Sequence, residues 1–173
     1  MQMLQNPLFV KFIVYFNENQ DYFECHEVLE EYWKSLSDST KDHLLTAYIL
    51  LSTGMYHFRR GNNIGARKTL QKAYTKMMTH SENFPDFIDG IDFNHLCNNL
   101  EHTINRLDEN KPFKSFQIQI NSQDLELLTN TMKHSIDLLP LGSEEVIHKH
   151  MLRDRSDILR IRDNRLNTSN DLK

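Results

Sequence analysis

The sequence predicts an all-α protein, a bundle of about five paired antiparallel helices followed by a helical extension. Leu, Met, Glu, Lys and Gln, all good helix formers, are frequent in the chain. Apolar residues recur at intervals of three and four positions rather than two. Most of the five glycines and four prolines lie between these periodic segments. This combination favours an all-α class.

The first two helices are expected to form an antiparallel pair. One runs from Pro7, a good first-turn residue, to about Glu18, and the other from a cap at Asp21 to about Lys34. Their apolar stripes are Leu8, Phe12, Tyr15 and Phe16 in the first and Tyr22, Cys25, Leu29, Tyr32 and Trp33 in the second. Only a short polar turn joins them, which predicts a helical hairpin.

The third helix is expected at the centre of the bundle because it is apolar over most of its circumference. It carries Leu44, Tyr48, Leu51, Met55 and Phe58 at helical spacing. Gly54 would let a neighbouring helix approach closely, and Gly61 suits the left-handed residue that ends a helix. Asn62 or Asn63 then caps a fourth helix that ends near His80.

The fifth helix follows a loop that contains Pro85 and Gly90, and Asp92 is its expected cap. Its inward face is Leu96, Leu100, Thr103 and Leu107. The segment from Lys111 to Ile120 alternates apolar and polar residues, which predicts an extended conformation over the bundle. Since a lone strand has no partner here, we predict no sheet.

Two further helices are expected in the C-terminal third. Ser122 or Asn121 caps a sixth helix with an apolar stripe of Leu125, Leu128, Met132 and Ile136. A seventh runs from Ser143 to about Leu166, with acidic residues in its first turn. We therefore divide the chain into a helical bundle (1–110), an extended segment with a two-helix extension (111–166) and a disordered tail (167–173).

The composition indicates a soluble cytoplasmic protein. The formal charge of −4 is mild and argues against nucleic-acid binding over the whole surface. Cys25 and Cys97 do not form a metal-binding or disulfide pattern, so we predict that both are reduced thiols. The N-terminus lacks the features of a signal peptide, and no apolar run is long enough to span a membrane. We expect no cofactor and no membrane association.

The densest group of functional side chains lies in the second helix, at His26, Glu27, Glu30 and Trp33. His26, Glu30 and Trp33 share one stripe of the helix, and Glu27 lies one step around it. An imidazole and a carboxylate four residues apart could bind a metal or act as general acid and base. The zincin pattern is absent because it needs two histidines, so no metal is assigned. A buried histidine held by a carboxylate is the structural alternative.

A second group lies at the C-terminal end of the central helix and comprises His57, Arg60 and Asn62. If the second and third helices pack against each other, this group and the first could form one polar pocket. A buried network of ion pairs would satisfy the same side chains without catalysis. The catalytic role of any of them is therefore left open.

The C-terminal extension contains two further patterns. His148 and His150 are two residues apart, so on a helix they point to different faces and should not chelate one metal. The second pattern is a set of arginines interleaved with acids: Arg153, Arg155, Arg160, Arg162 and Arg165. Such a helix could contact phosphates of RNA or DNA, although interleaved acids more often indicate a solvated helix or a docking surface for a protein partner.

The motif residues resemble the family called Domain of Unknown Function 309. The resemblance rests on Phe16 and Asn17, on the run from Tyr22 to Glu30 with Trp33, on Tyr56, His57, Arg60, Gly61, Asn62, Gly65 and Ala66, and on Gly90, Ile91 and Asp92. It covers about Leu8 to Leu107 and implies a small helical bundle, akin to tetratricopeptide packing, without an established activity. Many relatives carry a glutamine on the central helix where this chain has Leu50, which implies an incomplete polar site.

Three functions are compatible with these patterns. Our leading hypothesis is a non-enzymatic module that binds a protein partner through the groove between paired helices or through the charged seventh helix. The second is a hydrolytic or metal-assisted enzyme with a His/Glu pocket between helices two and three. The third is RNA or DNA binding through the C-terminal arginines. Substrate, partner identity and oligomeric state are not specified by the sequence.

Overall fold

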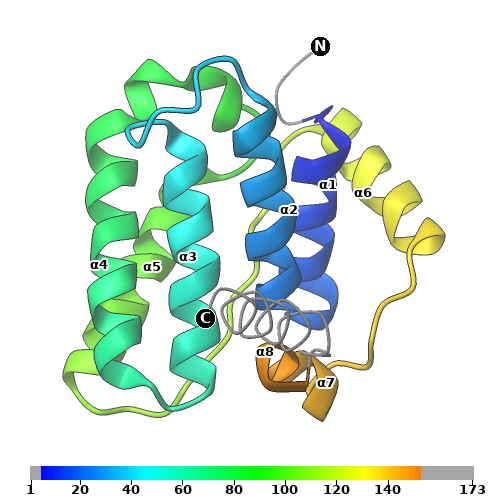
Figure 1. The fold of residues 1–173 in the computed structure, drawn as a ribbon. Helices are drawn as coiled ribbons and strands as arrows, with labels where there is room; N and C mark the ends of the chain where they lie inside the picture. Colours follow the sequence, from blue (N-terminus) through cyan, green and yellow to red (C-terminus); the bar gives the residue numbers. More distant parts are fainter. Residues whose placement is uncertain (1–4, 153–173) are drawn as a thin grey trace, which may run out of the picture.

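The structure, a computed structural model, describes residues 5–152 and has an all-α fold, as predicted (Figure 1). Its helices are α1 (Pro7–Val14), the π-helical turn η2 (Tyr15–Asn19), α2 (Tyr22–Ser35), α3 (Leu44–Arg59), α4 (Asn63–His80), the 3-10 turns η3 (Ser81–Asn83) and η4 (Pro85–Phe87), α5 (Phe93–Asp108), α6 (Gln123–Ser135), α7 (Glu144–Ile147) and α8 (Lys149–Leu152). None of the helices in residues 5–152 combines the length and apolarity needed to cross a membrane.

Local capping interactions fix where the main helices begin. The side chains of Asp21, Asn62, Asp92 and Ser122 each accept a hydrogen bond from the backbone N–H three residues on. Each bond satisfies a donor that the first helical turn would otherwise leave unpaired. Gly61, with a φ of 78°, follows the end of α3 in the left-handed region. The sequence-based prediction of these termini is confirmed.

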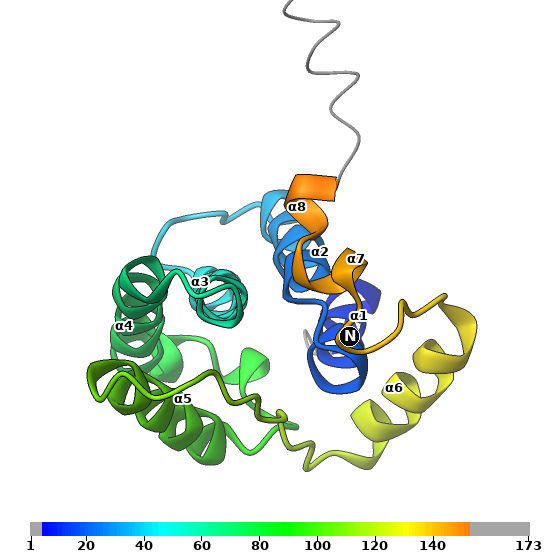
Figure 2. The ribbon, with the colours of Figure 1, turned by 90° about the horizontal axis from the view of Figure 1, so that it is seen from below.

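Helix α3 lies at the centre of the bundle, between α2 and α4 (Figure 2). Its inward residues are fully buried, and the ring of Tyr48 packs edge-on against Phe9 and Phe12 of α1. The Tyr48 hydroxyl donates a hydrogen bond to the Phe87 carbonyl, 2.8 Å away. A polar group at the centre of the core is therefore satisfied, as burial requires.

Helices α3 and α4 approach closely at Gly54. A Cβ placed on Gly54 would lie 2.4 Å from Cδ2 and 2.5 Å from Cγ of Leu70 on α4. Both residues are buried, so Leu70 fills the space that a side chain at position 54 would need. The close helix approach expected at this glycine is confirmed.

The extended segment between α5 and α6 crosses the bundle without forming a sheet. Among the described residues, β-type pairing is limited to isolated bridges that join Ile91 with Asp89 and with Ile120. The Asn17 amide takes the place of a partner strand: its Oδ1 accepts from the Ile118 N–H at 2.8 Å, and its Nδ2 donates to the Ile118 carbonyl at 2.9 Å. Ile118 is thereby held in the core.

The sixth helix departs from its predicted apolar stripe at one residue, Leu128. Its buried residues are Leu125 and Thr129, whereas Leu128, expected to face inward, is 37% exposed. The helix packs against α1, and Ile136 lies just beyond its last residue. The predicted stripe is therefore confirmed at Leu125, and Met132 packs partly buried against the core, but Leu128 was wrong because Thr129 takes the inward position.

The predicted seventh helix, a single helix from Ser143 onward, is interrupted at His148. In a continuous helix the Val146 carbonyl would accept from the His150 N–H. Here that carbonyl accepts from Arg59 Nη2 at 3.1 Å, and the His150 N–H donates to the Tyr56 hydroxyl at 3.3 Å. Tertiary hydrogen bonds thus replace one helical bond, and the segment forms two short helices, α7 and α8.

Candidate functional site

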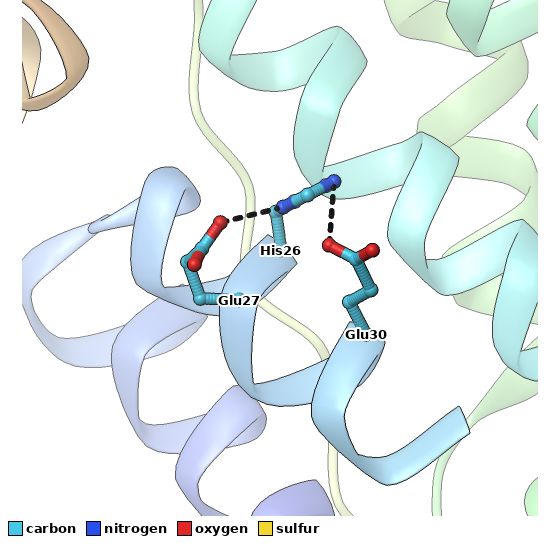
Figure 3. Close-up of side chains that lie close together, drawn as sticks. All are labelled: His26, Glu27 and Glu30. Atoms are coloured by element: carbon cyan, nitrogen blue, oxygen red, sulfur yellow. Dashed lines mark hydrogen bonds and ion pairs between the residues drawn. The ribbon is translucent and has the colours of Figure 1, made fainter. Parts of the chain in front are cut away.

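Three motif side chains gather on one turn of α2 (Figure 3). His26 lies between the two carboxylates, with Nδ1 3.2 Å from Glu27 Oε1 and Nε2 3.9 Å from Glu30 Oε2. Their side chains are 32%, 38% and 35% exposed, so solvent reaches all three. The i, i+4 spacing of His26 and Glu30 places them on the same face of the helix.

This cluster offers oxygen and nitrogen ligands to a cation. One ligand atom from each of His26, Glu27 and Glu30 lies within 4.8 Å of the others. Lys34 competes for the same carboxylate, because its Nζ is 2.6 Å from Glu30 Oε1. That hydrogen bond from Lys34 is the main reason that the pKa of Glu30 is lowered. The cluster can therefore act as a weak divalent-cation site or as a network of ion pairs on the surface.

A groove with mostly aromatic walls lies beside the cluster, between α2, α3 and α8. It has a volume of about 200 Å³ and is lined by Tyr22, Phe23, His26, Glu27, Thr53, Tyr56 and His150. The rings of Phe23 and Tyr56 lie 6.0 Å apart, and the His150 ring is perpendicular to Tyr56 at 5.4 Å. Glu27 adds a negative charge to a largely apolar cavity, which suits an apolar group with a cation next to it.

His57, Arg60 and Asn62 do not line this groove. Nδ1 of His57 lies 3.2 Å from the Asn62 amide nitrogen, so His57 pairs with the cap of α4. Burial and the nearby Arg60 lower the pKa of His57, which favours its neutral form. Arg60 instead lies over the ring of Tyr56, 5.3 Å from its centroid.

Trp33 lies near the other end of α2, away from the groove-lining residues. Its indole N–H donates to the Thr40 carbonyl at 3.0 Å, and its ring packs partly buried against the core. Trp33 therefore anchors the connection between α2 and α3. Of the seven side chains that the sequence grouped as a candidate pocket, His26 and Glu27 line the groove, and Glu30 lies beside them.

His150 is one of five groove residues that the predicted pocket did not include; the others are Tyr22, Phe23, Thr53 and Tyr56. The spacing of His148 and His150 was considered only for metal binding, and nothing in the local sequence indicates that this segment reaches α3, 94 residues earlier in the chain. The predicted nucleic-acid or partner contacts from Arg153 to Arg165 lie outside the described residues. That hypothesis stays a prediction.

Comparison with known proteins supports the resemblance inferred from the motif. Residues 9–69 match the model of the family described as Domain of unknown function (DUF309). The resemblance is therefore confirmed over α1, α2, α3 and the first part of α4. The segment that contains Gly90, Ile91 and Asp92 lies beyond the matched range.

The chain is also similar to the uncharacterized protein YpuF of Bacillus subtilis (strain 168). The two are 28% identical over 160 residues, which cover 90% of this chain and 91% of YpuF. The similarity therefore extends past residue 110 into the C-terminal extension. No solved structure matches the chain at a significant level.

Proposed function

We propose that this chain, in which residues 9–69 match a family of unknown function, is a non-enzymatic helical module that binds a peptide segment of a protein partner. The observation that carries the proposal is the open aromatic groove between α2, α3 and α8. Phe23 and Tyr56 form its apolar walls, and both belong to the motif. Aromatic side chains in a concave site are the usual anchors of protein recognition.

The chemistry of the surroundings specifies the kind of peptide. A second cavity, of about 250 Å³, adjoins the first at Phe23 and is lined by Phe23, Glu24, Leu139, Glu145, Lys149 and Leu152. Leu152, which is 59% exposed, lines this second cavity; Glu145 contributes negative charge to it, and Glu27 contributes negative charge to the first. We infer a ligand that has an apolar anchor residue next to a lysine or arginine.

A variant that fills the groove tests this proposal. Peptides selected from a random library on the full chain are expected to share an apolar residue flanked by a basic one. Thr53→Trp places a bulky ring in the cavity and should weaken binding of the selected peptide about 30-fold, the effect of losing one anchor worth about 2 kcal/mol. Fluorescence anisotropy of the labelled peptide measures the change.

Thr75→Trp is the matched control. Like Thr53, Thr75 donates its hydroxyl to the backbone carbonyl four residues earlier, but it lies on the exposed face of α4. The control should bind as the wild type does. Equal affinity of the Thr53→Trp variant, or a library that yields no binding peptide, would contradict the proposal.

The metal-assisted alternative is favoured by one observation, the convergence of His26, Glu27 and Glu30. It predicts that Zn²⁺ binds to the full chain and that His26→Ala weakens binding at least tenfold, as expected for loss of one ligand. Lys34→Met should tighten binding because the ammonium no longer competes for Glu30. Isothermal titration calorimetry measures both effects.

The control for the cation site is His95→Ala, since the His95 ring contacts Asn99 on α5. Unchanged Zn²⁺ affinity in the His26→Ala variant would remove the site. A Lys34→Met variant that binds no more tightly would show that the carboxylate of Glu30 is not a ligand.

A further inference from the structure

A further cavity lies at the end of the bundle opposite to α7 and α8, between the α2–α3 connection and the turns η3 and η4 (Figure 1). Its volume is about 260 Å³, and we call it the His43 cavity. His43 and Phe87 are buried and Leu36 and Phe84 are half-buried, so these four side chains form its interior. Among residues 5–152 it shares no lining residue with the aromatic groove between α2, α3 and α8, so the two are separate sites.

Three aromatic rings meet in the His43 cavity. The centroid of the His43 ring lies 4.4 Å from that of Phe84 and 4.9 Å from that of Phe87. The two phenylalanine rings lie 6.4 Å apart at an angle of 73°. A further ring can pack edge-to-face in such a corner, which is an arrangement that aromatic pairs prefer. The cavity therefore suits a flat aromatic group.

The hydrogen bond at the start of α3 fixes the tautomer of His43. Its Nδ1 accepts from the Leu45 N–H at 3.1 Å, so Nδ1 carries no hydrogen. Burial lowers the pKa of His43, and the smaller effect of Asp38 acts in the opposite direction, so the neutral ring is favoured. A neutral imidazole has one ring N–H, which here must be on Nε2. Nε2 is therefore a hydrogen-bond donor.

This donor lacks a protein partner in the described part of the chain. Within residues 5–152 no group accepts a hydrogen bond from Nε2, and Nε2 is not one of the polar atoms sealed in the core. His43 is only 5% exposed, so the accessible part of its ring opens on the cavity that it lines. Capping alone does not explain an imidazole, since Asp, Asn, Ser and Thr are the preferred caps. The N–H points to a ligand with an oxygen acceptor.

The rim of the His43 cavity is acidic. Asp38 and Asp86 lie there, both exposed, together with the polar side chains of Ser37 and Asn83. No lysine or arginine of residues 5–152 lines the cavity. With a neutral His43, the two carboxylates give the lining a negative charge, which disfavours an anion. A cation is attracted both by these carboxylates and by the faces of the aromatic rings.

We propose that the His43 cavity binds a small aromatic amine that also has a hydroxyl or carbonyl oxygen. The aromatic ring packs against Phe84 and Phe87, the oxygen accepts from His43 Nε2, and the ammonium faces the acidic rim. The cavity is slightly smaller than the usual site of a drug-sized ligand, so it suits a molecule of about ten non-hydrogen atoms. The site does not depend on the peptide groove, and either proposal can fail without the other.

Tyramine is a suitable probe because it combines a phenol with an ammonium and has about ten non-hydrogen atoms. It should bind the full chain at pH 7.5 with a dissociation constant in the millimolar range, typical of so small a ligand. In NMR spectra it should shift the amide signals of Leu45, Phe84 and Phe87 in a saturable way. The signals of Phe23 and Tyr56 in the aromatic groove should respond only at higher concentration. No saturable shift at the cavity, or a shift confined to the groove, would overturn the proposal.

Two relatives of tyramine test the two polar contacts on the wild-type chain. Phenethylamine lacks the hydroxyl and leaves Nε2 unpaired, so it should bind about tenfold less tightly. Tyrosol lacks the ammonium and should bind about threefold less tightly, because exposed carboxylates attract a cation only weakly. If phenethylamine binds as tightly as tyramine, His43 Nε2 is not the recognition element and the proposal is wrong.

His43→Asn is the matched variant, because the asparagine oxygen can still cap α3. It removes Nε2 and the ring, so tyramine should bind at least about tenfold more weakly and lose its advantage over phenethylamine. Tyramine binding of wild-type strength in this variant would contradict the proposal.

The double variant Asp38→Asn/Asp86→Asn keeps the test valid even if His43→Asn does not fold, because both positions are exposed. It should remove the advantage of tyramine over tyrosol, and an unchanged advantage would refute the role of the acidic rim. Asp89→Asn is the control, since Asp89 is an exposed neighbour that does not line the cavity, and it should bind tyramine as the wild type does.

Discussion

Replacing Gly54 by valine is expected to lower the free energy of unfolding by about 3 kcal/mol, the upper range for overpacking a core. The new Cβ would lie 2.4 Å from Leu70 Cδ2, and 3.3 Å from the Leu70 backbone nitrogen. Leu70 is fully buried and cannot swing into solvent. Helices α3 and α4 must therefore separate, although valine gains some helix propensity over glycine. Urea denaturation followed by circular dichroism measures the loss.

A second substitution shows whether the clash is the cause. Leu70→Ala alone should cost about 3 kcal/mol through the cavity that it leaves. Combined with Gly54→Val it should cost much less than the sum, because the valine fills part of that cavity. Thr75→Val, on the exposed face of α4, is expected to change stability by less than about 0.5 kcal/mol. Additive losses in the double variant would contradict close packing at this position.

The features of the fold that the sequence predicted are those set by local interactions. Each cap at Asp21, Asn62, Asp92 and Ser122 bonds within one helical turn, so a short stretch of sequence contains the whole signal. The end of α3 is likewise a local feature, because it requires only that Gly61 adopt a positive φ, which glycine does without strain. Helix boundaries were therefore accurate wherever a capping side chain defined them.

The interruption of the helix at His148 could not be predicted, because it depends on residues far away in the sequence. The acidic first turn and the apolar spacing around Val146 are compatible with a long helix. What breaks it is an arginine 87 residues earlier, which takes the Val146 carbonyl, and a tyrosine 94 residues earlier, which takes the His150 N–H. A competing donor and acceptor from another helix leave no trace in the local sequence.

In the candidate site, too, the contacts within one helix could be predicted from the sequence, whereas the contacts between helices could not. His26 and Glu30 are four residues apart on one helix, so their proximity follows from helical geometry. Whether His57 joins them depends on how α3 is rotated about its axis, which the periodic pattern fixes only coarsely because most of that helix is apolar. In the structure Thr53 and Tyr56 face the groove, and His57 faces the cap at Asn62.

The second large effect is expected at Asp21. Asp21→Ala should cost about 3 kcal/mol, because it removes the cap of α2, worth about 1 kcal/mol, and also leaves Lys149 partly buried with Glu24 as its remaining acid. The Asp21 side chain is only 1% exposed, so water cannot replace these bonds. Chemical denaturation of the full chain measures the total loss.

Asp21→Asn separates the two contributions because different oxygens make them. Oδ1 accepts from the Glu24 N–H, whereas Oδ2 binds Lys149, so asparagine can keep the cap while it presents an N–H₂ donor to the ammonium. We expect this change to cost about 2 kcal/mol in the wild type, within the range for a hydrogen bond between charged groups, and nearly nothing in a Lys149→Met background. The difference is the coupling energy between α2 and α8. If Asp21→Asn costs the same in both backgrounds, the ion pair contributes nothing, and α8 is held by its other contacts.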